Sequence, residues 1–481
     1  MAAIAFLAVV GLGSGQAHAA TLTVSGGCAI DEAVIAVNDA VDGNGCVKTG
    51  AAYGSSDTIN IPSGSHMAID VPEIENPVTI KGAGMDQTTV DADGLYEGFE
   101  SREATMVTIS DMKITNFIDS AIEIGQSSAV LKNLDIDGAG ADANGILVFA
   151  NDGGTYSLDA ENVYVHNIQS TNGYVVAAFL ITSDGQTNLN IDLRSTTIAD
   201  IHNTVGGAIG VYLVAGTDNE GGSNLTADVV NTTVHNITSP GFSAPFGSLA
   251  GADNGITNVN TNITNITITG MRGGAGSIPF PGLISAAYYA IGFTIEASDV
   301  ANVTTTVSNS IMADNLNDGV SSNCAVADAS ATFGGTGTVN AAIVSGGHNI
   351  SDDDSCAGFN QPGDLQNFDN IIPTLGPLQD NGGVVPTRAL LAGSPAIASG
   401  ASVLGVTTDA RGVVRNAECP SVGAFQFEGA VCAASTTNGG GTNAGAPNTG
   451  IGAVSPAMTI IATSLGLGII AYALRKRTAV K

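Results

Sequence analysis

The sequence has no tryptophan and little basic charge: its 14 Lys and Arg residues stand against 44 Asp and Glu residues, for a formal net charge of -30. So few cations exclude a nucleic-acid-binding protein, because neutralising phosphates needs clustered Lys and Arg. Charged residues make up only 12% of the chain, yet the hydrophobic fraction of 44% is too high for a disordered chain. The 63 glycines argue against a mainly helical protein, because glycine in a helix interior costs about 1 kcal/mol relative to alanine. The 481 residues therefore predict many short strands and tight turns, in about two to four domains or in one elongated repeat structure.

The N-terminus has the pattern of a secretory signal peptide over residues 1–20. An apolar run from Ala2 to Leu12 is followed by small residues that end in Ala17-His18-Ala19, which forms an A-x-A cleavage site. No Lys or Arg precedes the apolar run, which departs from the usual pattern. Export would permit disulfides, because they persist in oxidising compartments.

The C-terminus predicts a membrane anchor. Residues 451–474 carry no charge, are long enough to span a bilayer core of about 30 Å, and are followed by a basic tail at 475–481 that would remain in the cytoplasm. A flexible linker over 433–450 joins this span to the rest of the chain. Residues 21–445 would then lie outside the cell.

A short motif before the span resembles the L-P-x-T-G sorting signal that sortase cleaves in Gram-positive bacteria. Its residues are Ala446, Pro447, Asn448, Thr449 and Gly450, with Ala446 in place of the leucine. If the resemblance holds, cleavage after Thr449 would attach the protein to the cell wall. A turn that ends the linker before a permanent membrane anchor is the other interpretation, and both remain open.

Six cysteines follow the signal peptide, and no C-x-x-C motif occurs among them. Six cysteines allow 15 pairings, but their clustering at short separations favours Cys28 with Cys46, Cys324 with Cys356, and Cys419 with Cys432.

A six-residue theme recurs between residues 105 and 350. Its copies start at residues 112, 134, 163, 196, 232, 266 and 310, so they lie 22 to 44 residues apart. The third position is always apolar, and Asn, Asp or Gly follows it: the third residues are Ile114, Ile136, Val165, Ile198, Val234, Ile268 and Met312. This pattern is typical of a short strand that leads into a turn, since Asn, Asp and Gly tolerate the left-handed backbone of a sharp corner.

The expected fold is all-β: a right-handed parallel β-helix over residues 57–372, with a C-terminal transmembrane helix. Each strand has too little apolar surface to fold alone, so the coils must stack, with about 25 to 33 residues per coil and about nine to twelve coils from Asp57 to Ile350. A β-sandwich is the main rival, but its strands would recur at intervals of about 8 to 12 residues.

Both ends of such a stack need caps. Residues 21–56 would form the first, because Ile30, Val34, Val37 and Val41 fall on one face of a short helix. Residues 373–432 would form the C-terminal cap, where Asp409, Arg411 and Arg415 could make an ion pair that closes the last coil.

Both predicted caps resemble segments of bacterial surface proteins. Cys28, Glu32, Ala33 and Asn38 match the C-S-L-R-E-A motif at the head of many surface β-helix proteins, although Ala29 and Asp31 replace its serine and arginine. The segments 347–356, 375–400, 408–415 and 422–428 are similar to the "choice-of-anchor Q" domain of exported repeat proteins. The resemblance implies a β-helix with a surface anchor and no defined activity.

The chain contains no nucleophile-elbow, zinc-protease, Walker or dinucleotide-binding motif, so we predict no catalytic residue and no cofactor. Calcium remains possible at two groups of carboxylates, although solvated turn carboxylates are the commoner interpretation: Asp135, Asp137 and Asp142, and Asp352, Asp353 and Asp354. His166, His202 and His235 recur near strand ends and could converge on neighbouring coils.

The sequence thus predicts a surface-anchored β-helical protein for adhesion, whose partner is an extracellular glycan or a cell-surface ligand. An extracellular polysaccharide lyase or glycoside hydrolase is the alternative, since such enzymes place two or three carboxylates close together on one face.

Overall fold

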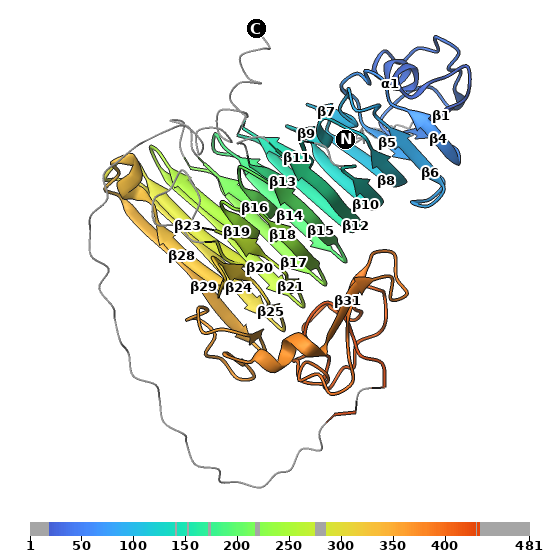
Figure 1. Cartoon of the computed structure of the whole chain (residues 1–481). Coiled ribbons are helices and arrows are strands. Elements are labelled where there is room, and N and C mark those ends of the chain that lie inside the picture. Colours follow the sequence, from blue (N-terminus) through green and yellow to red (C-terminus); the bar gives the residue numbers. More distant parts are fainter. Residues whose placement is uncertain are drawn as a thin grey trace, which may run out of the picture.

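The computed structural model describes residues 19–139, 142–151, 153–171, 175–216, 222–274, 285–429 and 431–432. These residues form an all-β protein with mostly parallel strands in two long sheets, an arrangement consistent with a β-solenoid (Figure 1). Within these ranges, no helix combines the length and the hydrophobicity that crossing a membrane requires. The expected signal peptide is described only from residue 19, and the sorting-like motif, the span at 451–474 and the basic tail lie outside the described residues.

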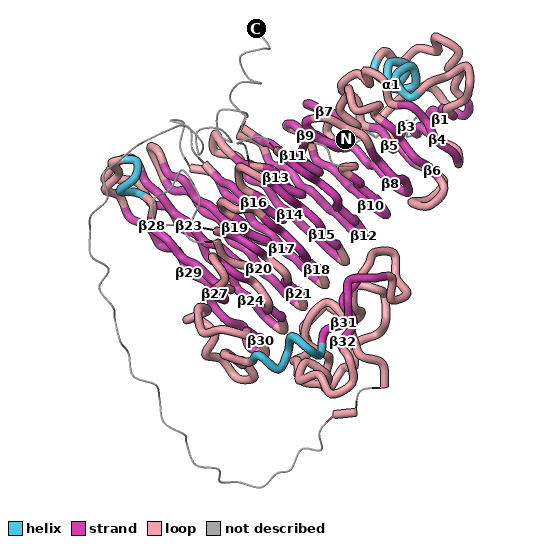
Figure 2. The backbone as a smooth tube through the Cα atoms, in the orientation of Figure 1, coloured by secondary structure: helices cyan, strands magenta, loops and turns pink. Residues whose placement is uncertain are grey.

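The chain passes back and forth between the two long sheets, and a third, two-stranded sheet lies in the C-terminal region (Figure 2). The first sheet comprises β1 (Ala20–Thr23), β2 (Thr49–Gly50), β3 (Asp57–Asn60), β4 (Gly64–Met67), β5 (Val78–Lys81), β6 (Thr88–Asp91), β8 (Met106–Thr115), β10 (Ser128–Asp137), β12 (Thr155–Ser170), β14 (Asn188–Arg194), β15 (Thr197–Asn203), β17 (Asn224–Val230), β18 (Thr233–Thr238), β20 (Ile256–Thr264), β21 (Thr267–Thr269), β22 (Arg272–Gly273), β24 (Val300–Ser308), β25 (Ile311–Ala313), β26 (Leu316–Asn317), β27 (Val320–Ser321), β29 (Thr338–Gly347) and β30 (Ile350–Ser351). The second comprises β7 (Phe99–Arg102), β9 (Asp119–Gly125), β11 (Ala143–Ala150), β13 (Val176–Ser183), β16 (Ala208–Ala215), β19 (Ser243–Ala252), β23 (Tyr288–Thr294) and β28 (Cys324–Asp328). The third pairs β31 (Leu375–Gln379) with β32 (Thr387–Leu390), and the helices are α1 (Ile30–Asn38) and the 3-10 turns η1 (Ser330–Phe333) and η2 (Asp369–Thr374).

Parallel pairing links successive turns of the chain into one ladder. From β3 to β29 the ladder has ten rungs, which lies in the expected range of nine to twelve: β3, β5, β8, β10, β12, β14, β17, β20, β24 and β29.

The repeated theme lies at the C-terminal ends of β8, β10 and β12, and in the later coils on the separate strands β15, β18, β21 and β25, which follow a corner after β14, β17, β20 and β24. Its seven apolar third residues pair in register from Ile114 to Met312, and every one of them is fully buried. The chain then turns sharply, because Asn116, Asn167, Asp200 and Asn236 adopt positive φ angles between 53° and 60°. The predicted apolar ladder with polar corners is therefore confirmed.

The N-terminal helix α1 packs on the first coils, as expected. Ile30, Val34 and Val37 are buried in the main core, and the Cys28–Cys46 disulfide connects the residues on either side of the helix. The prediction that Val41 belongs to the buried face was wrong. The helix ends at Asn38, because Ala40 adopts a left-handed φ of 54°, and Val41 is 61% exposed.

The C-terminal region does not simply continue the stack. Residues 373–429, which we call the flank domain, lie beside the first sheet, as the orange and red segment of Figure 1 shows. The Thr197 hydroxyl donates to the Pro386 carbonyl (2.7 Å), and an Arg415 guanidinium nitrogen donates to the Asn231 side chain (2.8 Å). His348, close to the end of the ladder, contacts the Ser399 carbonyl (2.6 Å). The flank domain thus covers several rungs.

Candidate functional site

The register places the outward residues of the theme in two columns on either side of the buried ladder. The second residues of the theme form one column: Lys113, Asp135, Tyr164, Thr197, Thr233, Thr267 and Ile311. The fourth residues form the other: Thr115, Asp137, His166, Ala199, His235, Thr269 and Ala313. The flank domain contacts these columns from Thr197 onward, so the charged residues gather just before it.

We call Lys113, Asp135, Asp137, Tyr164 and His166 the corner cluster. The Lys113 ammonium lies 2.7 Å from Asp137 and 3.6 Å from Asp135. His166 Nε2 lies 2.8 Å from Asp135 Oδ1, and the His166 ring stacks on Tyr164 with 4.0 Å between ring centroids. Five polar side chains from three neighbouring coils therefore converge at the strand ends.

The charges of the corner cluster are set by its own contacts. Burial acts to raise the pKa of Asp137, but hydrogen bonds from Lys113 and Asn167 outweigh it and hold that pKa below its ordinary value. Burial acts to lower the pKa of Lys113, but its contacts with Asp137 and Asp135 raise it. Burial raises the pKa of Tyr164 to about 12. At neutral pH the cluster thus presents a lysine cation, an aspartate anion and a protonated phenol.

The flank domain adds an arginine close to these columns. Arg388 on β32 donates through Nε to the Gly376 carbonyl (2.8 Å), and burial lowers its pKa. Burial also lowers the pKa of His235, and the positive charge of Arg388 lowers it further. The three histidines do not converge: His166 and His235 share a column with Ala199 between them, and His202 contacts Thr238 elsewhere on the outer surface.

A second charged group lies at the start of the second sheet. Arg102 pairs with Glu100 (2.6 Å) and with the fully buried Glu123 (2.9 Å). Carboxylate oxygens of Glu97, Glu100 and Glu123 all lie within 4.8 Å of one another, so these three residues could hold a metal ion. The Arg102 guanidinium also lies 5.0 Å from the centre of the Phe149 ring.

The expected calcium ligands fall in separate environments. Asp135 and Asp137 belong to the corner cluster, where Lys113 and His166 already contact them. Asp142 accepts a hydrogen bond from the Thr171 amide (3.1 Å). Asp354, near the end of the ladder, is exposed.

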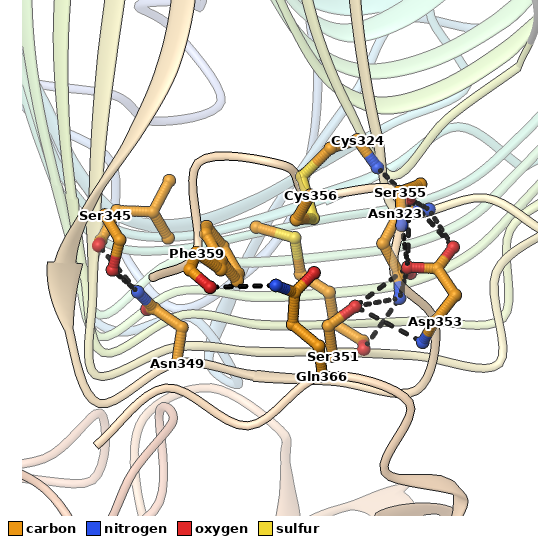
Figure 3. Close-up of a disulfide and its surroundings, with 12 residues drawn as sticks. Asn323, Cys324, Ser345, Asn349, Ser351, Asp353, Ser355, Cys356, Phe359 and Gln366 are labelled. Carbon is orange, nitrogen blue, oxygen red and sulfur yellow. Dashed lines mark hydrogen bonds between the residues drawn. A yellow bond between two sulfur atoms is a disulfide. The ribbon is translucent and has the colours of Figure 1, made fainter. Parts of the chain in front are cut away.

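Asp353 belongs to a buried polar network around the Cys324–Cys356 disulfide (Figure 3). Its carboxylate accepts hydrogen bonds from the main-chain N–H of Asn323 (2.9 Å) and from the Ser355 hydroxyl (2.8 Å). Asp352, which is also buried, accepts from the Asn323 side chain (2.7 Å), and burial raises its pKa. These carboxylates bind the protein's own donors and tie the last coils together.

The third disulfide, Cys419–Cys432, lies in and just after the flank domain, so all three pairs match the expected pairing. The expected ion pair also forms, since Arg411 lies 2.8 Å from Asp409. Its position differs from the expectation: it lies inside the flank domain, and the neighbouring Arg415 reaches Asn231 on an earlier rung.

The sequence interpretation missed Lys113, Tyr164 and the glutamate group. Lys113 and Tyr164 occupy the second position of the theme, so aligning its copies in register would have placed them beside Asp135. No pattern links Arg388 or the glutamates to their neighbours, because they come from segments without a shared repeat.

Comparison of the chain with protein-family models and with curated proteins gives no match in either case.

Proposed function

We propose that this protein is a right-handed parallel β-helix displayed on a cell surface, where it binds an extracellular glycan or another surface ligand without catalysis. The corner cluster is the observation that carries the proposal. A half-buried tyrosine and histidine stacked face to face offer an apolar ring surface, while Lys113 and Asp137 offer a strong donor and a strong acceptor beside it. Sugars present the same combination of an apolar ring face and hydroxyl edges.

Display at the surface rests on the sequence features of the two ends and on the resemblance of residues 347–428 to the choice-of-anchor Q domain. Three disulfides are in keeping with an oxidising compartment. Anchoring would use the apolar span at 451–474, with or without sortase cleavage after Thr449.

The proposal is tested with the full chain in mild detergent, on a glycan panel and on whole cells. We expect Tyr164→Ala and His166→Ala to weaken binding about tenfold, which corresponds to about 1.4 kcal/mol. His202→Ala is the matched control, because His202 is a half-buried histidine outside the corner cluster. Equal loss in the control, or no loss in the two cluster variants, would contradict the proposal.

An extracellular polysaccharide lyase or hydrolase is the second candidate, favoured by one observation. The His166–Asp135 contact of 2.8 Å beside Lys113 is the kind of arrangement that supplies a general base. Release of sugar fragments by the wild-type protein, abolished in Asp135→Asn, would establish this candidate and refute binding without catalysis.

A further inference from the structure

A different strip of the first sheet carries a regular set of uncharged polar side chains. Five consecutive rungs, β14, β17, β20, β24 and β29, each present three outward residues in strict register. We call these fifteen residues the asparagine array: Asn188, Asn224, Asn258, Asn302 and Asn340 in the first column, Asn190, Thr226, Asn260, Thr304 and Ala342 in the second, and Asp192, Asp228, Asn262, Thr306 and Val344 in the third. All fifteen are exposed or half-exposed.

The first column is a continuous hydrogen-bonded ladder. Each asparagine amide donates to the side-chain oxygen on the preceding rung, at 3.0 Å from Asn224 to Asn188 and 2.8 Å from Asn258 to Asn224. The ladder continues to Asn302 at 2.8 Å and to Asn340 at 2.9 Å. A side-chain amide has two N–H donors and two acceptor positions, so each interior member keeps one donor and one acceptor for a partner. The ladder also holds these groups in fixed orientations.

The charge of the array limits the kind of partner. The whole chain carries a net charge of -30, but the array has only two charged residues, Asp192 and Asp228, both at one edge. The remaining rungs β20, β24 and β29 contribute no charge to it. A polyanion gains nothing here and is repelled by the rest of the protein, whereas a basic partner finds few anions to pair with. An apolar partner would remove water from eleven Asn and Thr side chains, and it could not replace the hydrogen bonds that these side chains make to that water.

The spacing of the array fits a linear partner. Neighbouring rungs of a parallel sheet lie about 4.8 Å apart, so each column offers a donor and an acceptor at that interval along the solenoid axis. Hydroxyl groups both donate and accept, and an extended β-linked polysaccharide repeats them at a comparable interval. Both the hydrogen-bonding groups of the array and their spacing therefore match an extended polysaccharide.

We propose that the asparagine array is a second binding surface, which takes a neutral, extended polysaccharide with its chain along the solenoid axis. This inference goes beyond the proposed function, because the array is separated from the theme strands by corner residues with positive φ angles, among them Ser195, Asn231 and Asn265. The array and the corner cluster can therefore be altered independently.

The test uses the full chain in mild detergent and microcrystalline cellulose as the probe. The variant Thr226→Lys with Thr304→Lys places two long cationic side chains across the centre of the array, on either side of Asn260. The matched control is Thr58→Lys with Thr108→Lys, two outward threonines separated by one rung of the same ladder but outside the array. Thermal melting of both variants verifies that they remain folded.

We expect the wild-type protein and the control to sediment with cellulose, and the array variant to bind about tenfold more weakly. Polygalacturonate, a polyanion, should not compete. The proposal is overturned if the wild-type protein does not bind cellulose, or if the array variant binds as well as the control. Loss of cellulose binding in His166→Ala, with the array variant unaffected, would assign neutral glycans to the corner cluster and also overturn it. Inhibition of ice recrystallisation that depends on the array, without cellulose binding, would show that the regular face orders water and would refute the polysaccharide assignment.

Discussion

Ile198 lies in the middle of the buried ladder, paired with Val165 on one side and Val234 on the other. Its side chain is fully buried, so Ile198→Ala removes apolar contacts and leaves a cavity. We expect the free energy of unfolding to fall by about 2 to 5 kcal/mol, measured by urea denaturation. Asn190→Ala, an exposed change on the directly preceding strand β14, should alter it by less than about 0.5 kcal/mol. Equal effects of the two changes would contradict the assignment of this ladder to the core.

Because the pKa of His235 is lowered in the folded protein, acid should lower the stability of the fold. The unfolded chain has the ordinary histidine pKa of about 6.5, so it takes up the proton before the folded chain does as the pH falls. Stability is therefore complete above about pH 6.5 and declines as the pH drops toward the folded pKa. Arg388→Gln removes one of the two causes, and the pKa of His235 followed by NMR should rise. An unchanged pKa would mean that burial alone sets it.

At the residue scale, the sequence predicted correctly those features of the structure that depend on the chemistry of a single side chain. Apolar third positions and left-handed corners at Asn116 or Asn236 follow from local chemistry, and the structure confirms both. The corner cluster depends on register between coils. Aligning the copies of the theme places Lys113 beside Asp135, but it does not give the side-chain conformation that brings the Lys113 ammonium to Asp137 in the other column, so that contact could not be predicted.

At the scale of elements, the Cys324–Cys356 disulfide fastens β28, the final strand of the second sheet, to the segment after β30. Replacing both cysteines with serine opens a loop with a sequence separation of 32 residues. The chain-entropy model predicts a loss of about 3 to 4 kcal/mol. Hydrogen exchange should show the last coils opening first, since Asp353 and Ser355 are ordered beside the bond. Uniform loss of protection up to α1 would instead indicate that the solenoid unfolds as one unit.

The capping helix shows where element-level prediction succeeds and where it ends. Asp31 and Glu32 mark its first turn, as expected from the favourable interaction of acidic side chains with a helix N-terminus. Its end could not be located from periodicity, because Val41 continues the apolar pattern beyond Asn38. The flank domain was harder still: its turns are evident from the sequence, but nothing in residues 373–429 specifies which rungs they contact.

At the scale of the whole molecule, the charge of -30 should make stability depend on salt. Like charges repel one another in the compact state, and the screening length shortens from about 30 Å at 0.01 M salt to about 8 Å at 0.15 M. We therefore expect the melting temperature to rise over this range of sodium chloride. Potassium chloride at equal ionic strength should give the same rise, and a fall in either salt would show that attractive pairs such as Arg102–Glu123 outweigh the repulsion.

The attachment of the flank domain has a mechanical consequence. Its contacts run from Thr197 through Asn231 to His348, and the described chain ends at Cys432, which is bonded to Cys419 near this domain. A pull on the C-terminus is therefore shared as shear among several rungs and does not peel the last coil away. In the proposed surface display, a load on the anchor would therefore enter the rod through its side and not through its final coil.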